Sequence, residues 1–302
     1  MIEKSINKLI EDGFGMLPEN CWCSRDLVDK SKQELRSYLS FARSQASNPY
    51  FQAEASGAFG LRMAPSVSPS TLLLVHELLA VPYVRKFLES VLGINYKVWQ
   101  VNWRVCSPSD GGLYLHQDAL GEFNLTVLLD ESFEMEGSTI FVRGSHLFKK
   151  RLGSRSLSSR MFKFGRGLLS YMKGPPGAVG FFFNRTWHGR YPSATCDRSK
   201  TVLLISLFPE ADCFRSHDNL WEEGFLKTAP KRLREKIVNN IRAGVPGHHS
   251  DGKAIDLNPA ILAYEIENYP FQFNVSSVLN FLRVWGIFSV LSFKNILFGR
   301  AV

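Results

Sequence analysis

The sequence lacks any regular arrangement of cysteines. Its 302 residues include five cysteines that share no common spacing. The Cys21-x-Cys23 pair has no second pair with which to complete a zinc site. An odd and irregular set argues against a disulfide framework, and free thiols are the rule in a reducing compartment. We therefore expect neither structural zinc nor disulfides, and a cytoplasmic location.

Long apolar runs are also missing. The first residues mix Glu3, Lys4 and Lys8 with apolar positions, so no export signal is expected. Residues 275–302 are rich in Leu, Phe, Ile and Val, but their longest uncharged stretch, residues 284–293, is ten residues. That is too short to cross about 30 Å of hydrocarbon. The pattern favours an amphipathic helix that packs on its own domain, on a second subunit, or peripherally on the inner face of a membrane. The oligomeric state stays open.

Acidic residues are absent from one long segment. Residues 137–196 contain no Asp or Glu, although the formal net charge of the whole chain is only +8. The basic residues of this segment are Arg143, Lys149, Lys150, Arg151, Arg155, Arg160, Lys163, Arg166, Lys173, Arg185 and Arg190. A local excess of positive charge favours an anionic partner, such as a phosphorylated substrate, a nucleic acid or an acidic membrane surface.

Hydrophobic periodicity divides the chain into three parts. Apolar residues at a spacing of three and four predict helices over residues 2–12, 25–46 and 70–91. Period-two alternation or short apolar runs predict strands over residues 97–105, 123–129, 138–142, 178–183 and 201–207. We expect one α+β domain over residues 1–302. Its parts are helical residues 1–95, a mainly β core of residues 96–210 that forms a sandwich or barrel, and a helical extension of residues 211–302.

One constellation of side chains is suited to metal binding. His116 and Asp118 lie two apart on an extended segment, so both can face one point. His188 follows 72 residues after His116, far enough for another strand to return to the same place. Two histidines and one carboxylate on one face of a metal leave three positions open, and this arrangement lets Fe(II) bind an oxo acid and O2 together. The three residues are therefore candidate ligands and the catalytic centre.

Arg198 is a candidate for binding an oxo acid. It stands ten residues after His188, at the start of a predicted strand. A guanidinium can pair with the distal carboxylate of 2-oxoglutarate through two parallel hydrogen bonds. The alternative is a surface arginine in a turn beside Asp197.

These motifs, in their order along the chain, resemble the phytanoyl-CoA dioxygenase family of Fe(II)/2-oxoglutarate oxygenases. The similarity extends over residues 10–210. It rests on the segment 11–18, on His116-Gln117-Asp118, on residues 137–146 ending in Gly-Ser-His, and on residues 177–183 followed by His188 and Arg198. The resemblance implies a double-stranded β-helix, a jelly-roll or cupin-like fold, with helices packed on one side. It also implies a hydroxylase that uses 2-oxoglutarate and O2 and releases succinate and CO2. A carboxylate at Asp118 favours hydroxylation over the halogenation of related enzymes.

The polar face of the first strand supplies further candidates. Gln100, Asn102 and Arg104 alternate on one side of it, and Thr126 lies on the next predicted strand. We expect one or two of these side chains, chiefly Gln100, Asn102 or Thr126, to line the cosubstrate pocket. The alternative is that they are ordinary polar strand residues.

The substrate is indicated only by charge. Arg143 stands where the resembled family usually has proline, and residues 147–173 read as a variable basic loop. Candidate substrate-binding residues are Arg143, Lys149, Lys150 and Arg190. We expect an anionic substrate, for example a lipid-linked Kdo-type sugar. Alternative substrates are an acyl-CoA or a small metabolite. An alternative function is that of a non-catalytic binding protein on the same barrel, and nucleic acid is not expected as a partner. His146 is interpreted as part of a structural turn.

Overall fold

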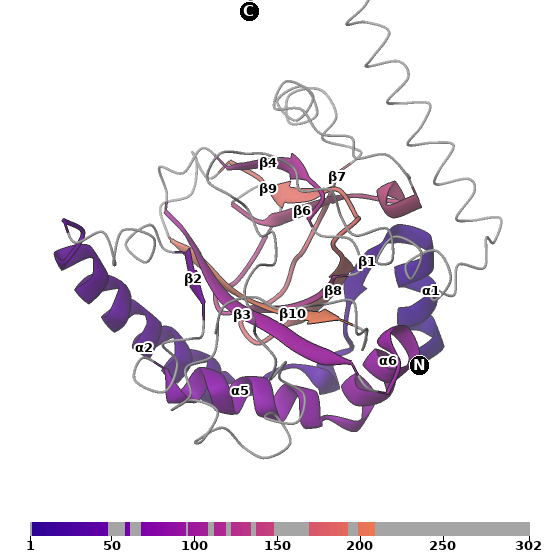
Figure 1. Ribbon diagram of the computed structural model, residues 1–302, viewed down its shortest axis with the longest axis horizontal. Coiled ribbons are helices and arrows are strands. Elements are labelled where there is room, and N and C mark those ends of the chain that lie inside the picture. The colour runs from indigo at the N-terminus through magenta and orange to yellow at the C-terminus, as the bar shows by residue number, and fades with distance from the viewer. Residues whose placement is uncertain are drawn as a thin grey trace, which may run out of the picture.

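The computed structural model describes most of the first 208 residues. The described ranges are residues 2–47, 58–60, 68–94, 96–107, 112–118, 122–133, 137–147, 169–192 and 199–208. They form a mixed helical and antiparallel β structure in which two sheets face each other and helices cover the outer side of the larger sheet (Figure 1). The predicted helical extension of residues 211–302, with its apolar tail, lies outside the described residues.

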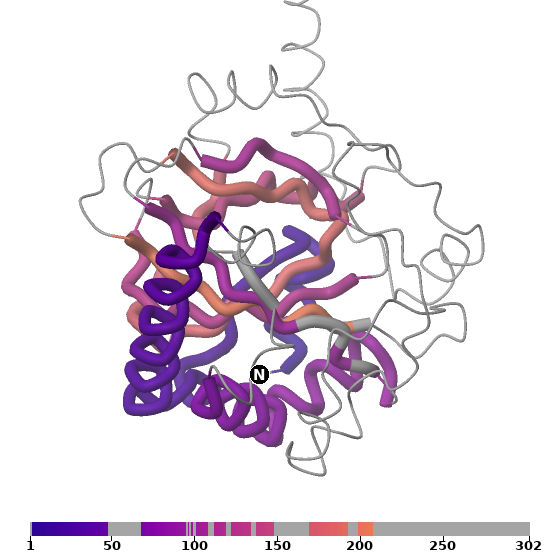
Figure 2. Tube along the Cα trace, turned by 60° about the vertical axis from the view of Figure 1, so that its left-hand side comes forward, coloured from indigo at the N-terminus to yellow at the C-terminus, as the bar shows by residue number. Residues whose placement is uncertain are grey.

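Four α-helices in the described part of the chain form the outer layer. They are α1 (Ile2–Asp12), α2 (Arg25–Ser44), α5 (Pro69–Ala80) and α6 (Pro82–Leu92), with short 3-10 helices η1 (Glu19–Cys21) and η4 (Ser145–Leu147). Ser24 and Ser68 cap α2 and α5 by accepting hydrogen bonds from the backbone N–H groups of Leu27 and Thr71. Figure 2 shows these helices wrapped along one side of the sheets.

The helix predicted over residues 70–91 is in fact two helices. The chain breaks between α5 and α6 at Val81, whose ψ of 124° is extended, and Pro82 begins the second helix. Proline has no N–H to donate and its ring disfavours a helical conformation of the preceding residue. Pro82 is instead well placed in the first turn of α6.

The strands form two antiparallel sheets. The six-stranded sheet has the order β1-β8-β5-β10-β3-β2, and the four-stranded sheet has the order β4-β9-β6-β7. The bounds are β1 (Phe14–Met16), β2 (Ala58–Gly60), β3 (Lys97–Cys106), β4 (Leu113–His116), β5 (Phe123–Leu128), β6 (Thr139–Val142), β7 (Leu169–Tyr171), β8 (Val179–Phe183), β9 (His188–Arg190) and β10 (Lys200–Phe208). The five strands predicted from periodicity are thus confirmed. The strands that periodicity missed have only three or four residues, too few to show an alternation.

Alternation along the large sheet separates an apolar layer from a polar one. Odd-numbered residues such as Trp103, Leu125 and Ile205 pack with the helices in the main core. Even-numbered residues face the small sheet, except Val98, which lies in the main core because a bulge shifts the register of β3 between Val98 and Gln100. Phe182 on β8, for example, lies 5.2 Å from Phe141 on β6, measured between ring centroids. The polar side chains found at even positions of β3, β5 and β10 therefore point into the space between the two sheets.

No helix among the described residues is both long enough and apolar enough to cross a membrane.

Candidate metal centre

His116, Asp118 and His188 converge between the two sheets. His116 ends β4 and lies directly opposite His188, the first residue of β9, in an antiparallel pair. Asp118 follows two residues after His116. One potential ligand atom from each residue lies within 4.8 Å of the other two, and no other group of three such residues occurs in the described part of the chain. Antiparallel pairing of β4 with β9 thus joins two motifs that are far apart in sequence.

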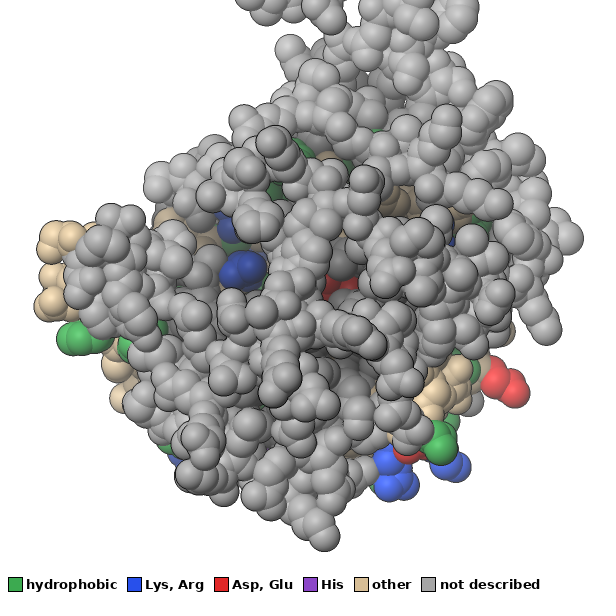
Figure 3. Space-filling view, viewed as in Figure 1, with side chains coloured by type: hydrophobic (Ala, Val, Ile, Leu, Met, Phe, Trp, Pro, Cys, Tyr) green, Lys and Arg blue, Asp and Glu red, His purple; other side chains and the backbone are tan. Residues whose placement is uncertain are grey.

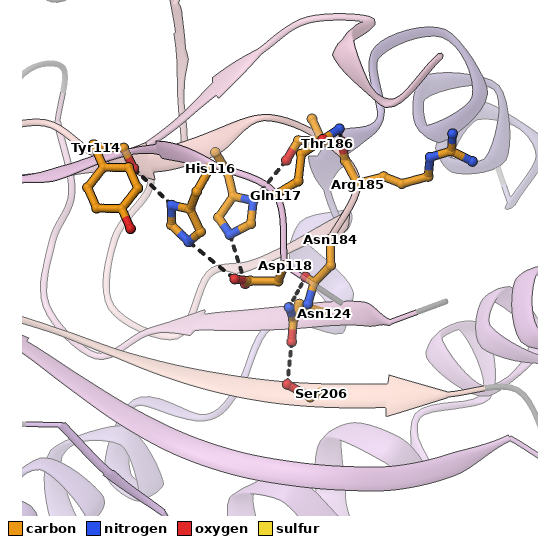
Figure 4. Close-up of polar contacts among 10 residues, drawn as sticks. Tyr114, His116, Gln117, Asp118, Asn124, Asn184, Arg185, Thr186 and Ser206 are labelled. Carbon is orange, nitrogen blue, oxygen red and sulfur yellow. Dashed lines mark hydrogen bonds and ion pairs between the residues drawn. The ribbon is translucent and has the colours of Figure 1, made fainter. Parts of the chain in front are cut away.

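The two imidazole rings are held in the same tautomer. Nδ1–H of His116 donates to the carbonyl oxygen of Tyr114, and Nδ1–H of His188 donates to that of Thr186, each at 2.8 Å (Figure 4). The Nε2 atoms of His116 and His188 are left to face the Asp118 carboxylate, at 3.3 and 3.1 Å. Backbone acceptors of this kind are the usual means of orienting histidine ligands. Three lone-pair donors aimed at one point fit a divalent cation.

Negative charge accumulates at this point. Burial acts to lower the pKa of His116, but the hydrogen bond and the charge of Asp118 outweigh it, so the pKa of His116 lies above its ordinary value. Nearby, burial and the charge of Asp118 raise the pKa of Glu122 to about 7. The charge of Asp118 contributes to both pKa shifts because water screens it poorly at this partly buried position. A bound cation would compensate that negative charge.

A polar network that the sequence analysis did not identify lies beneath the three candidate ligands. Ser206 on β10 donates to the Asn124 side chain on β5 at 2.7 Å, and Asn124 donates to the Asn184 side chain. The backbone of Asn184 forms two further hydrogen bonds. Its carbonyl oxygen accepts from the N–H of Asp118 at 3.0 Å, and its N–H donates to the carbonyl oxygen of Glu122 at 2.9 Å. The sequence pattern that could have indicated this network is the presence of polar residues at even positions of otherwise apolar strands. Their partners could not be known without the strand register.

Two predicted cosubstrate residues lie in the same interior. Thr126 and Asn102 are buried and stand on either side of Leu204 in the sheet register. The Thr126 hydroxyl is buried and forms no hydrogen bond with a described residue. The backbone of Gln100 lies opposite Ser206, but its side chain, like Arg198, falls outside what the structure describes.

The predicted substrate-binding residues do not lie together in the described structure. Arg190 on β9 lies two residues beyond His188 and so on the same face of the strand. Arg143 forms an ion pair with the buried Asp12 at the end of α1, with 3.2 Å between Nε and Oδ1. Lys149 and Lys150 lie outside the described residues.

His146 is not part of the metal-ligand group. It lies in η4, fully buried, and its Nε2–H donates to the carbonyl of Ile10 at 2.9 Å. Burial lowers its pKa to about 3, so the ring is neutral. Its place in a structural turn agrees with the interpretation of the sequence.

Comparison with known proteins identifies only the fold. No protein-family model and no curated protein matches the sequence. Among solved structures, the chain is similar to a non-heme monooxygenase, the ThoJ-Ni complex, at 20% identity over 68% of this chain and 76% of that one, with a TM-score of 0.50. It is also similar to HygX from Streptomyces hygroscopicus with nickel and 2-oxoglutarate bound (16% identity, 68% and 86% covered, TM-score 0.50). A third similar structure is that of AviO1 from Streptomyces viridochromogenes Tue57, at 14% identity over 70% of this chain and 96% of that one, with a TM-score of 0.51. The mixed helical and antiparallel β fold is therefore one that non-haem oxygenases use.

Proposed function

We propose that this chain is an Fe(II)- and 2-oxoglutarate-dependent oxygenase of the double-stranded β-helix type, which hydroxylates an unactivated C–H bond of an anionic substrate. The observation that carries the proposal is the convergence of His116, Asp118 and His188, with both histidines oriented through Nδ1. Likeness to HygX, whose structure holds nickel and 2-oxoglutarate, supports it. The phytanoyl-CoA dioxygenase family is the nearest description that the sequence motifs support.

The residues around the three ligands suit a small dicarboxylate. Bound Fe(II) with 2-oxoglutarate and O2 would supply the oxidant and release succinate and CO2. The buried Thr126 hydroxyl can donate a hydrogen bond to a ligand between the sheets and accept one from it. Asn102 lies at the same level of the sheet, since both residues pair with Leu204. The Phe182 ring, 4.8 Å from that of His188, excludes water from one side of the site. Arg198 remains the proposed partner of the distal carboxylate.

Two guanidinium groups favour an anionic substrate. Arg104 on β3 and Arg190 on β9 come from opposite sheets, and each occupies the position on its strand that faces the space between them. Arg104 is accessible to solvent and forms no ion pair with a described residue. Partial desolvation lowers its pKa; Asp118 opposes that shift and Arg190 adds to it, so all three charges act on one region. On the face drawn in Figure 3, basic side chains and an acidic one are visible near the centre of the view.

The first test is the spectrum of the anaerobic complex. Adding Fe(II) and 2-oxoglutarate to the metal-free protein should produce a weak visible charge-transfer band, because the keto acid chelates the metal. Glutarate, which lacks the keto group, is the control and should give no band. Absence of the band, together with no succinate formation from 2-oxoglutarate in the presence of any added substrate, would refute the oxygenase proposal.

The second test concerns substrate charge. A library of phosphorylated, carboxylated and neutral compounds is screened for stimulated succinate release, with lipid-linked sugars and acyl-CoA thioesters included. We expect an anionic hit whose KM rises about tenfold or more in Arg104→Gln, since a hydrogen bond to a charged group contributes about 1.5–3 kcal/mol.

Arg25→Gln is the matched control, because Arg25 is exposed on α2 and pairs with Asp29. A neutral preferred substrate would contradict the anionic class. A rise confined to the KM for 2-oxoglutarate would assign Arg104 to the cosubstrate instead.

A further inference from the structure

The turn between β8 and β9 connects to every part of the candidate metal centre. On one side, Asp118 N–H donates to the carbonyl of Asn184 at 3.0 Å, and the Gln117 side chain donates to that of Arg185. The proximal pair His116 and Asp118 is therefore attached to this turn. The distal ligand His188 follows it directly in the chain. The relative placement of the three ligands thus depends on how firmly residues 184–187 are held.

Ser145 holds this turn from the opposite side. Ser145 is 1% exposed, and its hydroxyl makes two hydrogen bonds at once. It donates to the carbonyl of Val142 at 2.6 Å and accepts from the backbone N–H of Trp187 at 2.7 Å. Val142 N–H also donates to the carbonyl of Trp187 at 2.9 Å. One side chain thereby joins the end of β6 to the residue immediately before His188.

The orientation of the His188 ring depends on the same short segment. Its Nδ1–H donates to the carbonyl of Thr186, so the backbone at positions 186 and 187 determines where Nε2 points. A second attachment supports this segment, because the Thr186 hydroxyl donates to the carbonyl of Gly13 at 2.8 Å. A shift of the Trp187 N–H would turn the ring away from Asp118, whose Oδ2 now lies 3.1 Å from Nε2.

We propose that Ser145 is a positioning residue of the metal centre, which acts through the backbone of Thr186 and Trp187 to aim His188 at the position shared with Asp118. The inference rests on the proposed metal site and extends it to a residue that touches neither metal nor substrate. A hydroxyl is suited to the role because it can donate and accept at once. Alanine at this position would leave a buried N–H and a buried carbonyl without this partner.

The test is a titration of the metal-free protein with Co(II), followed by calorimetry and by the visible absorption of the bound ion. We expect Ser145→Ala to bind Co(II) about 10- to 100-fold more weakly, the usual cost of removing a partner that orients a ligand. Its absorption spectrum should change, because His188 meets the metal at a different angle. Ser145→Cys keeps a weak hydrogen-bond donor, so its Co(II) affinity should lie between those of Ser145→Ala and the wild type.

Ser31→Ala is the matched control. Ser31 is also a fully buried serine, and its hydroxyl bonds to Thr71 between α2 and α5, away from the metal centre. We expect it to lose thermal stability as Ser145→Ala does while keeping wild-type Co(II) affinity.

Unchanged affinity and spectrum in Ser145→Ala, with a loss of stability like that of Ser31→Ala, would reduce Ser145 to a structural residue and overturn the inference. If Ser145→Ala fails to fold, Ser145→Cys is titrated in its place, and a Co(II) affinity and spectrum equal to those of the wild type overturn the inference equally. A wild-type protein that binds no Co(II) would refute the metal site itself, and the inference with it.

Discussion

Asp118→Asn is expected to fold like the wild type, to bind Co(II) or Fe(II) far more weakly, and to form no succinate. The substitution preserves size but removes the only carboxylate in the group of three candidate ligands. The loss of affinity should exceed the 10- to 100-fold that follows from removing an orienting partner, because the ligand itself is lost. Far-ultraviolet circular dichroism measures the fold, Co(II) titration measures the metal affinity, and an assay of succinate formed from 2-oxoglutarate measures the reaction.

Asp130→Asn is the control for this variant. Asp130 is a partly buried carboxylate that pairs with Lys32 at 2.7 Å and accepts from the backbone N–H of Thr201, but it belongs to no group of metal ligands in the described structure. It should lose stability and keep its metal. Wild-type metal affinity in Asp118→Asn would show that the carboxylate is not a ligand.

Gly13→Ala is expected to be the most destabilising of these substitutions. Gly13 has a φ of +84°, and a Cβ atom there would lie 2.4 Å from Thr186 Oγ1 and 2.5 Å from His146 Nδ1. The left-handed conformation costs a residue with a side chain about 1–2 kcal/mol, and overpacking a buried site costs about 1–3 kcal/mol more. Urea unfolding of the metal-free protein should therefore show a loss of roughly 2–5 kcal/mol in the free energy of unfolding.

Gly93→Ala separates the two causes. Gly93 has nearly the same φ, +83°, but no atom lies within 4 Å of the position its Cβ would take. With a ψ of 164° Gly93 lies in a backbone region that is essentially reserved for glycine, so the variant should lose only the conformational part, about 1–3 kcal/mol. Equal losses in the two variants would mean that the packing of Gly13 against Thr186 and His146 is loose, and that α1 is not firmly attached to the turn that carries His188.

Local patterns in the sequence were sufficient for much of the fold. The alternation in residues 97–105 predicted β3, and the separation of apolar from polar faces on that strand is what directs Asn102 and Arg104 between the sheets. The same local information misjudged the helix at residues 70–91. Apolar periodicity continues through Val81, whereas the break depends on the backbone of one proline.

The candidate ligands themselves were recognisable because their chemistry is local. His116 and Asp118 stand two apart, and few residue types other than histidine and carboxylates bind Fe(II) in this manner. That His188 belongs with them was inferred from spacing and resemblance. The pairing of β4 with β9 places it there.

The sequence by itself thus determined the residue types at the site, the periodicity of the strands and the local excess of positive charge, since all of these depend on neighbours along the chain. Only the tertiary structure decided which distant groups support them. Asn184 meets Asp118, Ser145 meets the residue before His188, and Gly13 meets Thr186. These contacts depend on strand register and on close packing of buried backbone, and a single sequence does not encode either as a local pattern.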